Sequence, residues 1–172
     1  MDVEIIENDP IKLLGMEYYG TIESIEGEEN QINDLWGRFS DFCKQNWELI
    51  EDKVINEKFS YEMHIWKEEA FKESGAFRTF IGVDVKDFEY IPIDLTAKII
   101  PASTYVNFKL KGEEINEWED LVDNQWLPDS NYYLRMVNGY LFDYQRYNEK
   151  EFKGIENLED SKLDVYVPIF RE

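Results

Sequence analysis

The sequence predicts an α+β fold of two βαββ modules related by pseudo-twofold symmetry, forming one domain over residues 1–172. Two observations support this prediction. Apolar residues change from strand-like to helix-like spacing and back, in the same order, at about 10–85 and again at about 98–170. No low-complexity tract or long flexible linker separates the halves, so we expect residues 86–95 to connect two modules that pack together.

Each module is expected to form an antiparallel sheet, or half of one, with a single main helix over one face. The remaining faces of the two modules then meet and leave a cleft at the pseudo-twofold interface. Small-molecule sites form preferentially in clefts of this kind.

The first module begins with a glycine-punctuated apolar stretch at 11–20, which lacks a helical period and predicts a strand. The acidic stretch from Glu23 to Glu29 predicts a loop. Apolar residues between 32 and 43 fall on one face of an amphipathic helix. Alternating polar and apolar residues then predict strands at 59–66 and 75–84.

The second module repeats this order. Residues 98–110 predict one long strand, and residues 113–125 predict a helix that Pro128 ends. Two further strands are expected at 140–147 and 162–170, joined by the charged loop 148–161.

Composition excludes several classes of protein. The net charge of −20 would repel a phosphate backbone, so we expect no direct nucleic-acid binding. No apolar run is long enough to span a membrane, and the N-terminus lacks the features of a signal peptide. A single cysteine, Cys43, suits a reducing cytoplasm. His64 is the only histidine, and neither a metal site nor a cofactor motif is expected.

The acidic charge itself has three open explanations. It can serve solubility, it can concentrate cations near a pocket, or it can present a DNA-like surface to a basic protein partner. Charge alone does not choose among them.

Four short motifs in the second module carry a family resemblance. They are Ile100-Pro101-Ala102 followed by Tyr105, Trp126-Leu127-Pro128, Gln145-Arg146-Tyr147, and Pro168-Ile169. In this order they resemble the GyrI-like, or AraC-type effector-binding, domain of multidrug-sensing transcription regulators. The resemblance implies a ligand pocket. In that family a Glu two residues before a Tyr meets cationic ligands, and here Gln145 occupies its place, which leaves the charge preference open.

Side-chain alternation places Asp143, Gln145 and Tyr147 on one face of their strand. The resemblance implies that Gln145 and Tyr147 face the pocket. Asp143 lies about 7 Å along the same face and could supply the missing negative charge. The alternative is that Asp143 sits at the strand edge in solvent.

Aromatic residues form the second group of candidates. Tyr and Trp rings provide flat apolar walls, and a ligand cation over such a ring gains about 0.5–2 kcal/mol. The alternative for each ring is ordinary core packing. Besides Tyr147, we expect ligand contacts from residues at family-like positions and on strands of both modules: Tyr105, Trp126, Tyr19, Tyr61 and Trp66.

Glu62 and His64 share one strand face with Trp66. A carboxylate beside an imidazole could form an acid–base pair, and the alternative is a half-exposed polar face.

Three functions remain open. The first is a binding protein for a small amphipathic or aromatic molecule, without a DNA-reading segment because the domain begins within about ten residues of Met1. The resemblance also implies hydrolysis of strained, cyclopropane-containing genotoxic compounds, for which Glu62 and Asp143 would be the catalytic candidates. The third is an acidic inhibitor that binds a basic protein. We expect a monomer or a weak homodimer.

Overall fold

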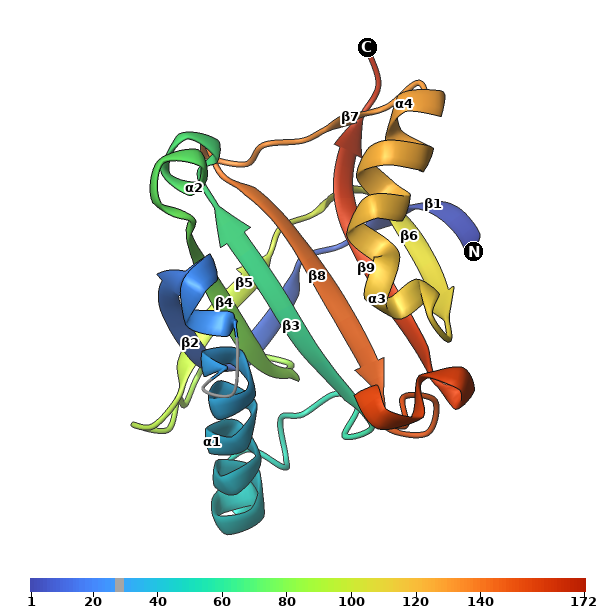
Figure 1. The fold of residues 1–172 in the computed structure, drawn as a ribbon. Helices are drawn as coiled ribbons and strands as arrows, with labels where there is room; N and C mark the ends of the chain where they lie inside the picture. The colour runs from blue at the N-terminus through green and yellow to red at the C-terminus, as the bar shows by residue number, and fades with distance from the viewer. Residues whose placement is uncertain (27–29) are drawn as a thin grey trace.

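The computed structural model describes residues 1–26 and 30–172 (Figure 1). Of the loop predicted from Glu23 to Glu29, residues 27–29 lie outside the described part, and Ile22–Ile25 form a short 3₁₀ helix (η1). In the described residues, no helix is both long and apolar enough to cross a membrane.

One antiparallel sheet runs through both modules, and the described residues contribute nine strands to it. Eight strands follow the order β1-β6-β9-β8-β3-β4-β2-β5, and β7 pairs with β9. The strands are β1 (Asp2–Asn8), β2 (Ile11–Thr21), β3 (Phe59–Trp66), β4 (Ala76–Asp84), β5 (Thr96–Ile100), β6 (Ser103–Lys111), β7 (Tyr133–Leu134), β8 (Leu141–Asn148) and β9 (Lys162–Phe170).

The α+β class with one main helix on each half is confirmed. The halves do not stack as separate sheets. They join edge to edge because β3 of the first half pairs with β8 of the second over its whole length, from Phe59 opposite Asn148 to Trp66 opposite Leu141. This junction satisfies the backbone groups of two strands that would otherwise be free edges.

Two helical segments cover the same face of the sheet, one over each half (Figure 1). Helix α1 (Gln31–Asn46) begins at Asn30, whose side chain accepts hydrogen bonds from the amides of Ile32 and Asn33. Its apolar face packs on β2 and β4. Helix α3 (Glu114–Asp120) packs on the β6–β9 half. The strands β3 and β8 therefore lie between the two helices.

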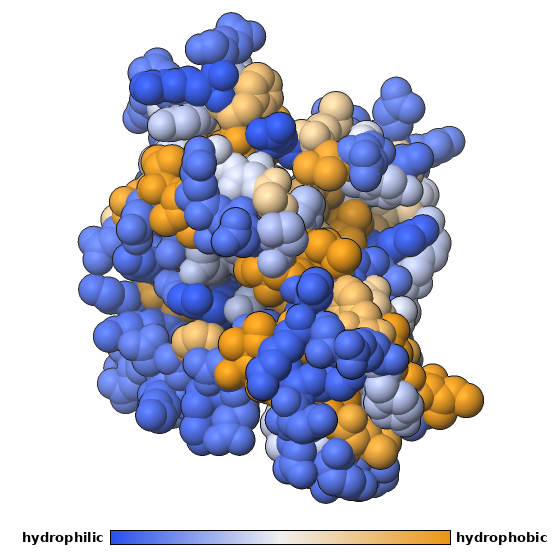
Figure 2. All heavy atoms as spheres, turned by 180° about the vertical axis from the view of Figure 1, so that it is seen from behind, coloured by the Kyte–Doolittle hydropathy of each residue, from blue (hydrophilic) through white to orange (hydrophobic). Residues whose placement is uncertain are grey.

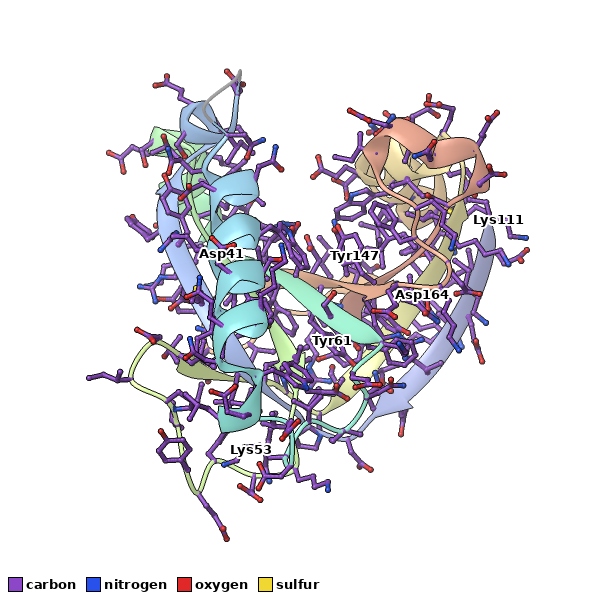
Figure 3. All side chains as sticks on the ribbon, turned by 90° about the horizontal axis from the view of Figure 1, so that it is seen from below. Asp41, Lys53, Tyr61, Lys111, Tyr147 and Asp164 are labelled. Carbon is purple, nitrogen blue, oxygen red and sulfur yellow. The ribbon has the colours of Figure 1, made fainter. Side chains whose placement is uncertain are left out.

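The opposite face carries a separate core that is rich in tyrosine. Tyr144 and Tyr166 stack there at 4.5 Å between ring centroids. Figure 2 shows the molecule from this side, with mostly hydrophilic atoms and an apolar band through the middle. The view along the sheet in Figure 3 separates the two faces, with Tyr147 directed into the gap between the helical segments and Tyr61 directed away from it.

Some predicted boundaries were wrong. The strand expected at 98–110 is two strands, β5 and β6, because the chain turns at Pro101-Ala102. The second helix does not stop before Pro128. It passes through a π-helical turn (Leu121–Trp126) into α4 (Leu127–Asp129), and that wider turn accommodates the proline.

A strand and a helix near the N-terminal half's ends were also missed. Strand β1 pairs with β6 of the second half, and the short helix α2 (Glu68–Ser74) follows β3. Helix α2 ends at Gly75, whose backbone is in the left-handed conformation.

Candidate ligand-binding cavity between the two modules

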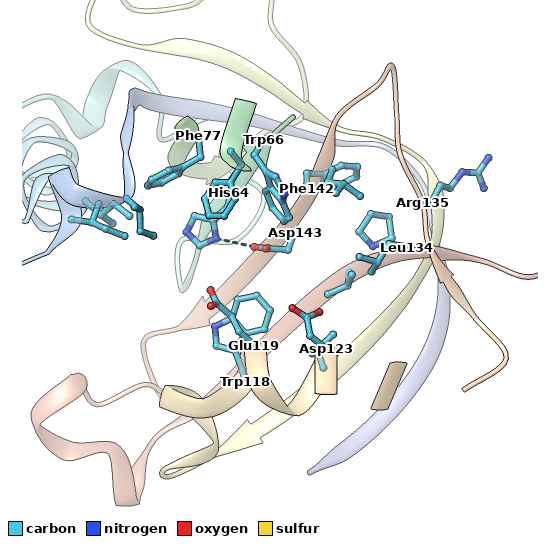
Figure 4. A pocket seen from close by; sticks show the side chains of 18 residues that line it. His64, Trp66, Phe77, Trp118, Glu119, Asp123, Leu134, Arg135, Phe142 and Asp143 are labelled. Atoms are coloured by element: carbon cyan, nitrogen blue, oxygen red, sulfur yellow. Dashed lines mark hydrogen bonds and ion pairs between the residues drawn. The ribbon is translucent and has the colours of Figure 1, made fainter. Parts of the chain in front are cut away.

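A cavity of about 320 Å³ lies on the helix-covered face, where the two halves meet. Both halves contribute to its walls (Figure 4). From the first half come the η1 region, β3, α2 and β4, and from the second half come α3 with its π-helical turn, β8 and β9. Apolar and aromatic side chains dominate these walls, including those of Ile22, Ile25, Trp66, Phe71, Phe77, Trp118, Val122 and Phe142.

The polar floor of the cavity comes from the pairing of β3 with β8. His64 lies directly opposite Asp143, and both line the cavity. Glu62 lies directly opposite Gln145 in the next pair on this face, just beyond the lining. His64 Nδ1 is 2.8 Å from Asp143 Oδ1, and His64 Nε2 is 2.8 Å from Glu62 Oε2. The indole N–H of Trp36, on α1, donates to Glu62 Oε1 at 2.6 Å. One imidazole thus bridges two buried carboxylates contributed by two strands.

These contacts set the charge states of the cluster. Burial opposes a charge on His64, but the carboxylates of Asp143 and Glu62 outweigh it and hold the pKa of the imidazole well above its usual value. Burial also opposes ionisation of Glu62, and hydrogen bonds from His64 and Trp36 lower the pKa of this carboxyl nevertheless. Both shifts favour an ion pair between the protonated ring of His64 and the carboxylate of Glu62.

Two further carboxyl groups face this floor from the other half. Glu119 and Asp123 lie one helical turn apart on α3 and its π-helical turn, and both line the cavity (Figure 4). Burial, and then the negative charge of Asp143, raises the pKa of each carboxyl. Arg135 also borders the cavity, but Figure 4 shows its guanidinium directed away from it.

The three residues predicted for one face of β8 share that face, but only Asp143 reaches the cavity. Asp143 lines the cavity and is buried, so it does not sit in solvent. Gln145 and Tyr147 lie farther along the strand, beyond the cavity lining. The Tyr147 hydroxyl donates to Gln145 Oε1, and its ring packs edge-on against Trp36 at 5.4 Å.

Of the predicted aromatic residues, Trp66 lines the cavity. Tyr61 and Tyr105 belong to the core on the opposite face, where the Tyr105 hydroxyl donates to the carbonyl of Pro101. Trp126 packs between Phe108 and Tyr132. Tyr19 is 66% exposed, outside the cavity. None of these last four residues lines the cavity.

Several wall residues were missed from the sequence. Phe71 belongs to the unpredicted helix α2, and Trp118 lies in the predicted helix at 113–125, from which no ligand contact was expected. Helical spacing could have identified the carboxyl groups of Glu119 and Asp123 as candidates. Glu119 and Asp123 directly follow the apolar positions Trp118 and Val122, so they border the face that packs on the sheet.

The fold and this cavity define an effector-binding domain of the GyrI-like class. The chain belongs to the family of integron-associated effector binding proteins (Cass2), whose model matches residues 4–169. No sequence among curated proteins matches the chain significantly.

Solved structures share the fold at low sequence identity. An integron cassette protein of Vibrio cholerae has a TM-score of 0.60 at 16% identity, with 98% of this chain and 95% of that chain covered. The protein SAV2435, solved with bound tetraphenylphosphonium, has a TM-score of 0.65 at 12% identity, with coverages of 99% and 94%. The C-terminal domain of EcmrR has a TM-score of 0.63 at 17% identity, with coverages of 99% and 98%.

Proposed function

We propose that this protein binds a small amphipathic, aromatic cation in the cavity between its two modules. One observation carries the proposal: apolar and aromatic walls enclose an excess of carboxylates. Asp143 lies on the floor, Glu119 and Asp123 face it from the opposite wall, and Glu62 lies behind the floor in contact with His64.

The walls suit a bulky cation that water solvates weakly. Aromatic side chains such as Trp66 and Phe77 offer ring faces over which a cation gains about 0.5–2 kcal/mol each. The carboxylate of Asp143 adds a charge–charge attraction that a largely desolvated site strengthens. A neutral ligand of the same shape would gain only the apolar contacts.

Two independent facts support this ligand class. The net charge of −20 favours the approach of cations. A solved protein with the same fold, SAV2435, holds tetraphenylphosphonium, which is an aromatic cation.

The same geometry argues against His64 and Glu62 as the general base of a hydrolase. A general base needs a free lone pair, but both ring nitrogens of His64 are engaged with carboxylates. Both oxygens of Glu62 are engaged as well, one by His64 and the other by the indole N–H of Trp36.

Two ions of matched shape and opposite charge test the proposal. Tetraphenylphosphonium and tetraphenylborate each carry four phenyl groups on one central atom. We expect tetraphenylphosphonium to stabilise the protein by about 2.7 kcal/mol at a hundredfold excess over its Kd. Tetraphenylborate should not stabilise it. Equal stabilisation by both ions, or by neither, would contradict the proposed cation site.

A further inference from the structure

His64 is held between two carboxylates, in a geometry that favours a proton on both ring nitrogens. Each nitrogen lies 2.8 Å from a carboxylate oxygen, one from Asp143 and one from Glu62. A neutral imidazole has one N–H donor and one lone pair, so one of these contacts would place a lone pair against a carboxylate oxygen. The ring is therefore an imidazolium, and the cavity floor already contains a cation.

The imidazolium of His64 lies beside Asp143, the carboxylate that would attract a bound cation. His64 and Asp143 both line the cavity, side by side across the β3–β8 pair (Figure 4). A ligand cation attracted to Asp143 must approach the imidazolium that Asp143 already holds. Two like charges a few ångströms apart in a partly desolvated site repel each other strongly.

The charged and titratable groups around His64 affect how strongly its ring holds the second proton. From the sheet, Glu62 and Asp143 contact the ring, and the un-ionised phenol of Tyr147 lies farther along β8. From the second half, Glu119 and Asp123 face the floor. Among the described residues that line the cavity, the remaining basic group is Arg135, which is directed outward (Figure 4).

We propose that a cationic ligand and the His64 proton compete for the carboxylate of Asp143, so that binding of the ligand releases a proton to solvent. This proposal rests on the proposed function, because it applies only to a cation bound in this cavity. No covalent bond changes: the imidazolium loses one N–H proton to the buffer, and the ligand replaces its positive charge beside Asp143. His64 is then a specificity-determining residue. It lowers the affinity for any cation that cannot displace its proton, and it does not compete with neutral ligands.

Proton release makes affinity depend on pH in a defined direction. A ligand that lowers the proton affinity of His64 binds more tightly as pH rises, by at most about tenfold per pH unit for one proton. The dependence extends from the pKa of His64 in the complex up to its pKa in the free protein. Protonation of Glu119 and Asp123 would weaken cation binding on the acidic side, so the measurement belongs at neutral to alkaline pH.

Isothermal titration calorimetry of the full chain with tetraphenylphosphonium tests this directly. Titrations at one pH in two buffers of different ionisation enthalpy give the number of protons released. We expect a release above zero and at most one proton, and a Kd that falls as pH rises from neutral to alkaline values. In His64→Gln both effects should disappear, and binding at pH 7 should become tighter because the internal cation is gone.

The outcomes separate the two proposals. If wild-type protein binds tetraphenylphosphonium with a buffer-independent enthalpy and a flat Kd, the competition is overturned and the proposed function stands. If wild-type protein does not bind it at any pH, the proposed function itself fails. A His64→Gln variant that keeps the wild-type pH dependence would assign the proton to another group and overturn the role of His64. Should this variant not fold, the wild-type buffer comparison still decides whether a proton is released.

Discussion

Glu62 is the direct cross-strand partner of Gln145 in the β3–β8 pair. The amide of Gln145 therefore faces a buried carboxylate from the neighbouring strand, on the same sheet face as the cavity. Gln145 carries no negative charge, but two neighbours on this face have carboxyl groups. Glu62 lies opposite it on β3, and Asp143 lies two residues before it on β8.

Loss of the Asp143 charge should weaken cation binding. In Asp143→Asn the amide oxygen can still accept from His64, but the attraction to the ligand is gone. We expect the Kd for tetraphenylphosphonium to rise about tenfold or more. Calorimetry checks this against Asp52→Asn, which makes the same change of net charge at an exposed position. Equal effects of the two variants would show that only the overall charge matters.

Gln145→Glu should strengthen the preference for cations and reduce stability. The new carboxylate would be buried opposite Glu62, and an unpaired buried charge commonly costs about 1–3 kcal/mol. The ratio of tetraphenylphosphonium to tetraphenylborate affinity measures the first effect, and urea unfolding measures the second. An unchanged ratio would mean that this side chain does not influence the cavity.

Trp36→Phe should destabilise the protein by about 1–3 kcal/mol, because it removes the indole donor of the buried Glu62. The aromatic ring against Tyr147 is kept. Trp47→Phe, in the same core cluster, serves as the control for loss of indole volume. Equal unfolding free energies for the two variants would argue against the hydrogen bond to Glu62.

Stability should decrease from neutral to alkaline pH through His64. Its pKa in the folded protein is raised above the unfolded value of about 6.5. The stabilisation is therefore fully present below that unfolded value and is lost as pH rises through the folded pKa. Denaturant unfolding at several pH values measures this, with His64→Gln subtracting the effect of general charge repulsion. The same slope in both proteins would exclude His64 as its source.

The sequence predicted the local part of this architecture well. Period-two alternation placed Asp143 with Gln145, and Glu62 with His64, on single strand faces. Helical spacing identified α1 and most of α3. These features depend on residues close together in the chain.

Features that depend on distant pairing were not predictable in this way. Nothing local to β3 shows that its partner is β8, so the contact of His64 with Asp143, 79 residues away, could not be foreseen. For the same reason, alternation could not tell which face of a strand meets the cavity, and Tyr61 and Tyr105 lie on the other face.

A crystal structure of the protein with tetraphenylphosphonium tests the central claim most directly. We predict that the ligand lies in the cavity between the two modules, with its phenyl groups against Trp66 and Phe77 and its positive centre nearest Asp143. Ligand bound on the opposite, tyrosine-rich face, or an empty cavity at a saturating concentration, would contradict the proposed site.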